Sequence, residues 1–217
     1  KDVGHNQEAF QEVRKLFNGQ QYCSTPKPIR LINQISKIGS NPNELILDLF
    51  SGSGTTAHAV MALNAQDGGN RKSISVQLPE LTDEKSEAYK AGYKTIADIA
   101  KERIRRAGKK IEEDLKHQIE ELQVKIKELE AELPTEETKA EIENLKSKIE
   151  ELQHQDLGFK VLKLADSNFK QWQQITGKDK QALEEQMKLF VDPVAKNATN
   201  DNMVYELLLK SGKDLNS

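Results

Sequence analysis

The chain has 217 residues, of which 36% are hydrophobic and 31% are charged, and its formal net charge is −3. This length is enough for one domain with a buried core and an appended segment. The composition is typical of a globular protein with a long solvated helical section. A lone cysteine, Cys23, excludes an intrachain disulfide and favours a reducing compartment, so we expect a cytoplasmic protein. No apolar stretch approaches the roughly 20 residues that span a bilayer.

The charge is distributed unevenly along the chain. Basic residues outnumber acidic ones over residues 1–111, and the reverse holds over residues 112–217. The first part is therefore the one expected to face nucleic acid. The chain starts at Lys1 with neither a Met nor a signal-peptide pattern, and we expect it to be a piece of a longer protein.

The first half of the chain alternates between helical and strand patterns. Helices are predicted over 7–18, 28–38, 57–63 and 94–107, and strands over 44–50 and 73–78. Turn signals separate them at 41–43 and 67–70. A strand–helix–strand–helix order predicts an α/β fold with a parallel sheet and right-handed crossovers.

A coiled-coil pattern follows. Apolar residues recur every three or four positions from Leu115 to Leu133 and again from Ile142 to Leu152, with Pro134 between the two runs. Two such seams joined by a short turn predict an antiparallel helical hairpin over 112–155, with arms roughly 30 Å long.

The remaining residues return to a mixed pattern. Residues 158–164 alternate like a strand, which makes the hairpin an insertion ahead of a third strand of the sheet. Further helices are predicted over 179–191 and 201–210. The predicted organisation is a sheet-forming part over 1–111, the hairpin over 112–155, and a final strand with C-terminal helices over 156–217.

The strongest candidate site is a glycine-rich turn after the first strand. Glycines permit tight backbone angles and close approach of a ligand, and the helix that follows points free N–H groups into the site. A phosphate-binding P-loop needs Lys after the last glycine, where this chain has Thr55. A dinucleotide site stays open, because Gly52-Ser-Gly54-Thr-Thr-Ala57 fits G-x-G-x-x-G/A and Glu80 lies roughly 20 residues on.

The flanking residues favour a third ligand. The segment Asp48-Leu-Phe-Ser-Gly-Ser-Gly-Thr-Thr56 resembles the cofactor motif of amino-methylating DNA methyltransferases. Pro26-Lys27-Pro28 resembles the Lys-Pro motif that precedes it in the β order of motifs. Val76-Gln-Leu-Pro-Glu80 and the helix from Thr95 to Arg106 look like the modification subunit of bacterial type III restriction–modification systems, an adenine-N6 DNA methyltransferase.

This resemblance implies S-adenosylmethionine as cofactor and a Rossmann-like methyltransferase fold. Phe50 and the two glycines of the turn would line the methionine moiety, with Asp48 fixing the loop. The two threonines would hydrogen-bond the amino-acid end, and Lys27 would meet the carboxylate. Either Gln77 or Glu80 would hydrogen-bond the ribose hydroxyls, and both remain candidates. The implied cofactor-binding residues are Lys27, Asp48, Phe50, Gly52, Gly54, Thr55, Thr56, Gln77 and Glu80.

The catalytic element of such enzymes is missing from the sequence. Methyl transfer to adenine N6 needs an Asp/Asn/Ser-Pro-Pro-aromatic tetrapeptide that holds a flipped base, and Asp192-Pro193-Val194 does not supply it. We therefore assign no catalytic residue to this chain and expect it to be inactive alone. The four histidines show no metal-ligand spacing.

The resemblance also implies partners. These are double-stranded DNA through the parent protein, a second modification subunit and the restriction subunit, with the hairpin as the expected subunit contact. The basic run from Lys101 to Lys110 fits either DNA phosphates or the end of a helix. Two other functions remain as alternatives, a nicotinamide-dependent oxidoreductase and a non-catalytic fragment that binds partners.

Overall fold

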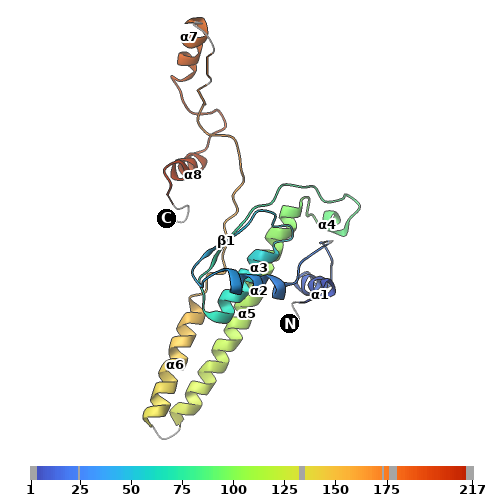
Figure 1. Cartoon of the computed structure of the whole chain (residues 1–217), viewed down its shortest axis with the longest axis vertical. Helices are drawn as coiled ribbons and strands as arrows, with labels where there is room; N and C mark the ends of the chain where they lie inside the picture. Colours follow the sequence, from blue (N-terminus) through green and yellow to red (C-terminus); the bar gives the residue numbers. More distant parts are fainter. Residues whose placement is uncertain (1–3, 24, 132–134, 173, 176–179, 214–217) are drawn as a thin grey trace. The chain divides into compact units, whose positions relative to one another are not determined.

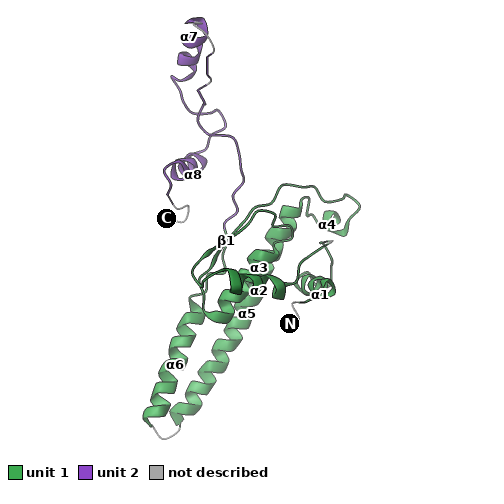
Figure 2. Cartoon of the chain, viewed as in Figure 1, with its two compact units in different colours: residues 1–159 green, residues 160–217 purple. Residues whose placement is uncertain are grey.

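The computed structural model describes residues 4–23, 25–131, 135–172, 174–175 and 180–213. The chain divides into two compact units, residues 1–159 and 160–217 (Figure 2). Figure 1 labels the helices and β1. The first unit contains α1 (Asn6–Leu16), α2 (Ile29–Gly39), β1 (Leu45–Asp48), α3 (Thr55–Asp67), β2 (Lys72–Ser75), α4 (Glu87–Lys90), α5 (Ile96–Ala131) and α6 (Glu136–Gln153). The second contains α7 (Lys180–Leu189) and α8 (Asn200–Lys210).

The sheet of the first unit consists of β1 and β2, which pair in parallel from Leu45↔Lys72 to Asp48↔Ser75. The α/β class with a parallel sheet is thus confirmed, although each strand is shorter than predicted because pairing ends after four residues. One face carries a row of aliphatic side chains that remain about half exposed, among them Leu45, Leu47 and Ile74.

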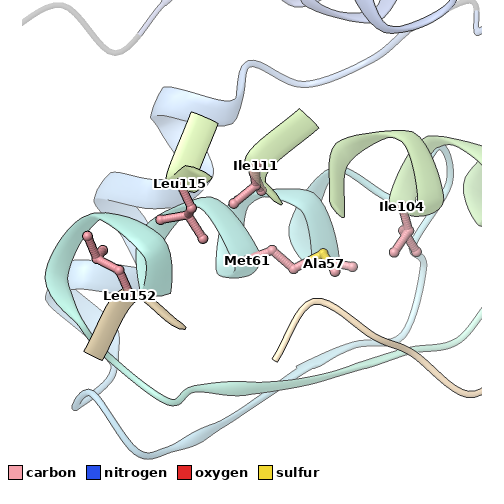
Figure 3. Close-up of a cluster of buried hydrophobic side chains, with 6 residues drawn as sticks. All are labelled: Ala57, Met61, Ile104, Ile111, Leu115 and Leu152. Atoms are coloured by element: carbon pink, nitrogen blue, oxygen red, sulfur yellow. The ribbon is translucent and has the colours of Figure 1, made fainter. Parts of the chain in front are cut away.

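Helix α3 carries the main core of this unit. Ala57 and Met61 of α3 meet Ile104 and Ile111 of α5, and the same cluster takes in Leu115 of α5 and Leu152 of α6 (Figure 3). Apolar residues cover nearly the whole circumference of α3, and most of its first three turns are buried. A helix apolar all round must be enclosed on several sides, which explains why α2 and α5 both pack against it.

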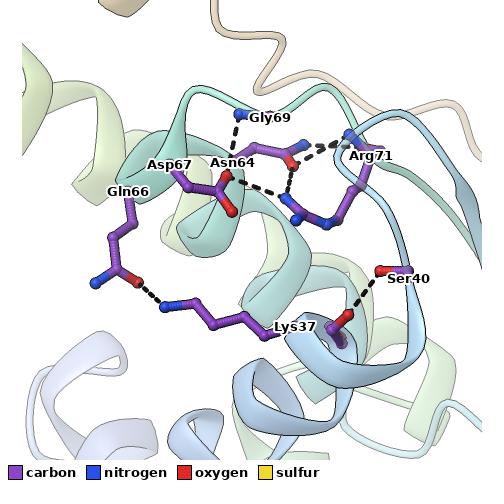
Figure 4. Close-up of polar contacts among 8 residues, drawn as sticks. Lys37, Ser40, Asn64, Gln66, Asp67, Gly69 and Arg71 are labelled. Carbon is purple, nitrogen blue, oxygen red and sulfur yellow. Dashed lines mark hydrogen bonds and ion pairs between the residues drawn. The ribbon is translucent and has the colours of Figure 1, made fainter.

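A polar network fixes the connection from α3 to β2. Asn64 accepts a hydrogen bond from the backbone N–H of Arg71 (3.1 Å) and donates to its carbonyl (2.8 Å), and the Arg71 guanidinium lies 3.0 Å from Asp67 (Figure 4). Gly68 ends the helix with a φ of 70°. These bonds hold the predicted turn over 67–70 and set where β2 begins.

The long helix α5 continues without a break through the position at which the hairpin was expected to start, residue 112. Gly108 lies inside this helix. A Cβ at this position would approach the carbonyl oxygen of Leu157 to 3.0 Å, which explains why the residue is a glycine. Helix α6 packs against α5 (Figure 1), and it begins at the N-cap Thr135, whose side chain accepts from the N–H of Thr138.

The segment that follows α6 differs from its sequence pattern. Residues 158–164, for which a third strand is predicted, have no strand assignment. A strand needs a hydrogen-bonded neighbour, and in the described part of the chain β1 and β2 pair only with each other. The side chain of Leu164 is 99% exposed.

In the second unit, Glu206 of α8 holds the loop before α7. Its carboxylate lies 2.7 Å from Lys210 and accepts hydrogen bonds from the Ser167 hydroxyl and the Asn168 backbone. These contacts, Lys210 first, lower the pKa of Glu206 to about 2. Across the described ranges of both units, no helix combines the length and apolarity needed to cross a membrane.

Candidate functional site

The glycine turn, residues 49–54, joins the end of β1 to the start of α3. Gly52 and Gly54 have φ values of 52° and 76°, a region that favours glycine. Gly54 is also the N-cap of α3, so the helix starts at Thr55, ahead of the predicted range 57–63. The first N–H groups of α3 therefore open toward the turn.

Asp48 fixes the turn from the end of β1. One carboxylate oxygen accepts from the Thr56 hydroxyl at 2.5 Å, and the other accepts from the Phe50 backbone N–H at 3.0 Å. Because both oxygens are engaged, Asp48 ties the last residue of β1 to the first turn of α3. The expected loop-fixing contacts of Asp48 are present in this structure.

Gln77 fixes the turn from the segment that follows β2. Its side-chain oxygen accepts from the Gly52 backbone N–H at 2.7 Å, and its amide nitrogen donates to the Leu78 carbonyl at 3.2 Å. The Val76 carbonyl accepts from the Ser51 backbone N–H at 3.0 Å. The Gln77 side chain thus reaches the turn, with its oxygen already engaged by the backbone there.

Phe50 lies at the tip of the turn with 87% of its surface exposed. An aromatic ring at the carboxyl end of a parallel strand normally finds an apolar contact. The exposed Leu78, at the corresponding end beyond β2, adds a second apolar side chain to this edge. The edge is therefore chemically suited to an apolar ligand moiety.

Lys27 and Glu80, the two remaining predicted residues, are both exposed. Lys27 lies between the buried Pro26 and Pro28, ahead of α2. Glu80 uses its backbone carbonyl to accept from Ile96 at the start of α5. No hydrogen bond joins either side chain to the glycine turn within the described residues. The structure thus brings seven of the nine predicted residues together, Asp48, Phe50, Gly52, Gly54, Thr55, Thr56 and Gln77.

Arg103 of α5 is a site residue that sequence reasoning missed. It is fully buried, and its Nη1 donates to the Ser53 hydroxyl at 2.8 Å and to the Thr55 hydroxyl at 2.7 Å. In the sequence it belongs to a basic run, but it also lies four residues after Ile99 and four before Ala107, both buried. That helical spacing was the available signal for a buried arginine.

Three other cations of this run, Lys101, Arg105 and Arg106, are paired with acidic neighbours. Lys101 lies 2.7 Å from Asp98, and Glu102 pairs with both Arg105 and Arg106 at 2.6 and 2.7 Å. Arg106 also stacks on Phe17. These i,i+3 and i,i+4 pairs are what a solvated helix face provides. They weaken the case for phosphate contacts by this part of α5.

His58, one turn into α3, is buried close behind the site. Burial, with Arg103 and Lys110 nearby, lowers the pKa of His58 to about 3, so the imidazole is neutral at pH 7. Over the residues that the structure describes, no group of His, Cys, Asp and Glu side chains is arranged to hold a metal ion.

The part of the chain that contains this turn also matches known proteins. The chain belongs to the N6/N4 DNA methylase family, which it matches over residues 4–121. That range includes both strands and the whole glycine turn.

Three curated relatives share between 40% and 44% identity with the chain. It is 44% identical over 110 residues to the type III restriction–modification enzyme StyLTI Mod subunit of Salmonella typhimurium, covering 51% of this chain and 17% of that protein. It is 42% identical over 103 residues to the EcoP15I Mod subunit of Escherichia coli, covering 47% and 16%. It is 40% identical over 100 residues to the type II methyltransferase M.KpnI of Klebsiella pneumoniae, covering 46% and 24%. The chain thus matches less than a quarter of the length of each.

Proposed function

We propose that this chain is the cofactor-binding part of a DNA methyltransferase that transfers a methyl group from S-adenosylmethionine to adenine N6, in a type III restriction–modification system. The observation that carries the proposal is the glycine turn. Asp48 at the end of β1 and Gln77 just beyond β2 hold it, and Phe50 within it stays exposed. The family match and the Mod-subunit relatives support it.

The proposed binding mode follows from the chemistry of the turn. The ring of Phe50 and the backbone of Gly52 and Gly54 receive the apolar methionine chain. The N–H groups at the start of α3, with the hydroxyls of Thr55 and Thr56, face its polar end. Lys27 is the proposed point charge for the carboxylate.

The ribose hydroxyls need an acceptor near the end of β2. The side-chain oxygen of Gln77 already accepts a hydrogen bond from the Gly52 N–H. Glu80 is exposed and keeps an acceptor-only carboxylate. Glu80 is therefore the better candidate of the two.

The methyl donor supplies an electrophilic methyl group on sulfur, and this chain's own residues bind and orient it. The sequence has no Asp/Asn/Ser-Pro-Pro-aromatic tetrapeptide to hold the target amine, so we propose that the chain binds cofactor without transferring the methyl group. In the parent protein, double-stranded DNA, a second modification subunit and a restriction subunit complete the system. The proposed fold is the Rossmann-like methyltransferase sheet, represented here by two of its strands.

A calorimetric titration of the chain with S-adenosylmethionine and, separately, with NAD tests the cofactor. We expect heat of binding with the methyl donor and none with the dinucleotide. Binding of NAD instead would make the chain a nicotinamide-dependent protein. A filter assay for labelled methyl groups on DNA should stay at background for the chain alone.

We further propose that the α5–α6 hairpin, residues 112–155, is an insertion that contacts another subunit. Its exposed surface carries charged pairs that bridge the two helices, Lys125–Glu141 at 2.7 Å and Lys146–Glu130 at 3.7 Å. Replacing residues 116–151 by a short Gly-Ser linker in the parent protein should weaken subunit assembly measured by light scattering. Unchanged assembly would leave the hairpin as a spacer.

A further inference from the structure

Arg103 lies directly behind the glycine turn, on the side away from solvent. Its Nη1 bonds the hydroxyls of Ser53 and Thr55, which flank Gly54. Helix α5 approaches so closely here that a Cβ on Gly54 would lie 3.2 Å from the Ala100 carbonyl oxygen. The guanidinium is thus held against the turn by the packing of α5.

The charge of Arg103 has no salt-bridge partner within the described ranges, and its Nε and Nη2 have no hydrogen-bond partner there. The groups that act on it electrostatically are the Cys23 thiol and the Glu12 carboxylate, while His58 is neutral. Glu12 already accepts from the Ile29 backbone N–H. Burying a cation without a paired anion costs several kcal/mol. Such a cation beside a candidate site indicates a functional role for its positive potential.

The contacts of Arg103 also decide where two hydroxyl protons point. A guanidinium only donates, so the Ser53 and Thr55 oxygens must accept from it. The two hydroxyls lie 3.3 Å apart, so one can donate to the other. The second hydroxyl proton remains for another acceptor, and the Cys23 thiol and a ligand compete for it. The start of α3 adds N–H groups with partial positive charge at the same place.

We propose that Arg103 is a positioning residue for a carboxylate bound at the glycine turn. It acts through the Ser53 and Thr55 hydroxyls, which it orients, and through the positive potential that it supplies from behind. This inference rests on the proposed function, in which the carboxylate belongs to the amino-acid tail of S-adenosylmethionine. It adds a residue from α5 that touches no ligand atom.

The test separates the carboxylate from the rest of the ligand. The 217-residue chain is titrated calorimetrically with S-adenosylhomocysteine and with its analogue that lacks the carboxylate. We expect Arg103→Met to weaken binding of the carboxylate-bearing ligand about tenfold, the range of one charge-assisted interaction. Binding of the decarboxylated analogue should change less than about twofold, because that ligand makes no use of the charge.

Two further variants keep the result decisive. Arg105→Met removes an exposed arginine two residues along the same helix and should leave both affinities unchanged. Ser53→Ala removes one of the oriented hydroxyls with a minimal change of volume, and it should reproduce the selective loss even if Arg103→Met does not fold.

Equal weakening of both ligands in Arg103→Met and Ser53→Ala would overturn the inference, because a residue that only supports the fold does not distinguish them. A wild-type chain that binds neither ligand would instead refute the proposed function, and the inference with it. The two failures are therefore distinguishable.

Discussion

On the side that faces α5, the glycine turn is packed and bonded: Gly54 and Thr55 are buried against Ala100 and Arg103. On the side that faces the open edge of the sheet, Phe50 leaves 87% of its surface exposed. The helical side is therefore complete within this chain. The open side has the apolar character of a surface that receives something else. Structural stability should depend on the first side, and contact with the apolar part of the ligand on the second.

Gly54→Ala should give the largest loss of stability. A Cβ at this position meets the Ala100 carbonyl at 3.2 Å and the Ile104 side chain at 3.3 Å, and the φ of 76° is itself unfavourable for alanine. We expect a loss of about 3 kcal/mol in the free energy of unfolding, measured in urea.

Gly92→Ala is the matched control. Its φ is 97°, but a Cβ there has nothing within 4 Å. It should lose only about 1 kcal/mol, the cost of the backbone conformation. Equal losses at the two positions would mean that the packing of α5 on the turn contributes nothing.

A smaller effect is expected from His58, which α3 and α5 bury behind the turn. Its pKa is depressed to about 3 in the folded chain, against an ordinary value of 6.5. Between these two pKa values, His58 is therefore protonated in the unfolded chain and neutral in the folded chain. Stability is full above pH 6.5 and falls as the pH drops toward 3, by up to about 1.4 kcal/mol per pH unit from this group.

The comparison between pH 7 and pH 5.5 measures this contribution before most carboxylates titrate. His58→Leu should show a smaller decrease in unfolding free energy over that interval than the wild type. The Nδ1 of His58 has no hydrogen-bond partner among the described residues, so the leucine leaves no polar group stranded. An identical decrease in both proteins would show that His58 is protonated in the folded state.

Phe50→Ser should have the smallest effect on stability and a clear effect on binding. Because the ring is already exposed, the free energy of unfolding should change by less than about 0.5 kcal/mol. The affinity for S-adenosylmethionine should fall roughly tenfold, because the ligand loses an aromatic contact. A variant that binds as tightly as the wild type would place the cofactor away from Phe50.

Much of the first unit was predictable from the sequence. The helical spacing located α1 and α2 to within about two residues, and the helix predicted over 57–63 is α3, which starts earlier, at Thr55. Asp48 was expected to fix the loop because the cofactor motif that its segment resembles implies that role. These predictions depend on local geometry, which a short stretch of sequence determines.

Other features depend on contacts between distant residues. Arg103 was grouped by its charge with the neighbouring cations, although its place on the apolar face of α5 buries it. Residues 158–164 alternate like a strand, but alternation supplies no partner. Gln77 was one of two candidates for the ribose hydroxyls, and the contact of its oxygen with the N–H of Gly52, 25 residues away, could not be predicted. Such pairings require the folded arrangement.

The central claim is that the glycine turn receives the methyl donor, and photolabelling tests it most directly. The chain is irradiated with methyl-labelled S-adenosylmethionine, digested with trypsin and mapped by mass spectrometry. We expect the label in the peptide of residues 38–71, which contains Phe50, and its loss when unlabelled S-adenosylhomocysteine competes. Label confined to another peptide, or label that the competitor does not reduce, would contradict the claim.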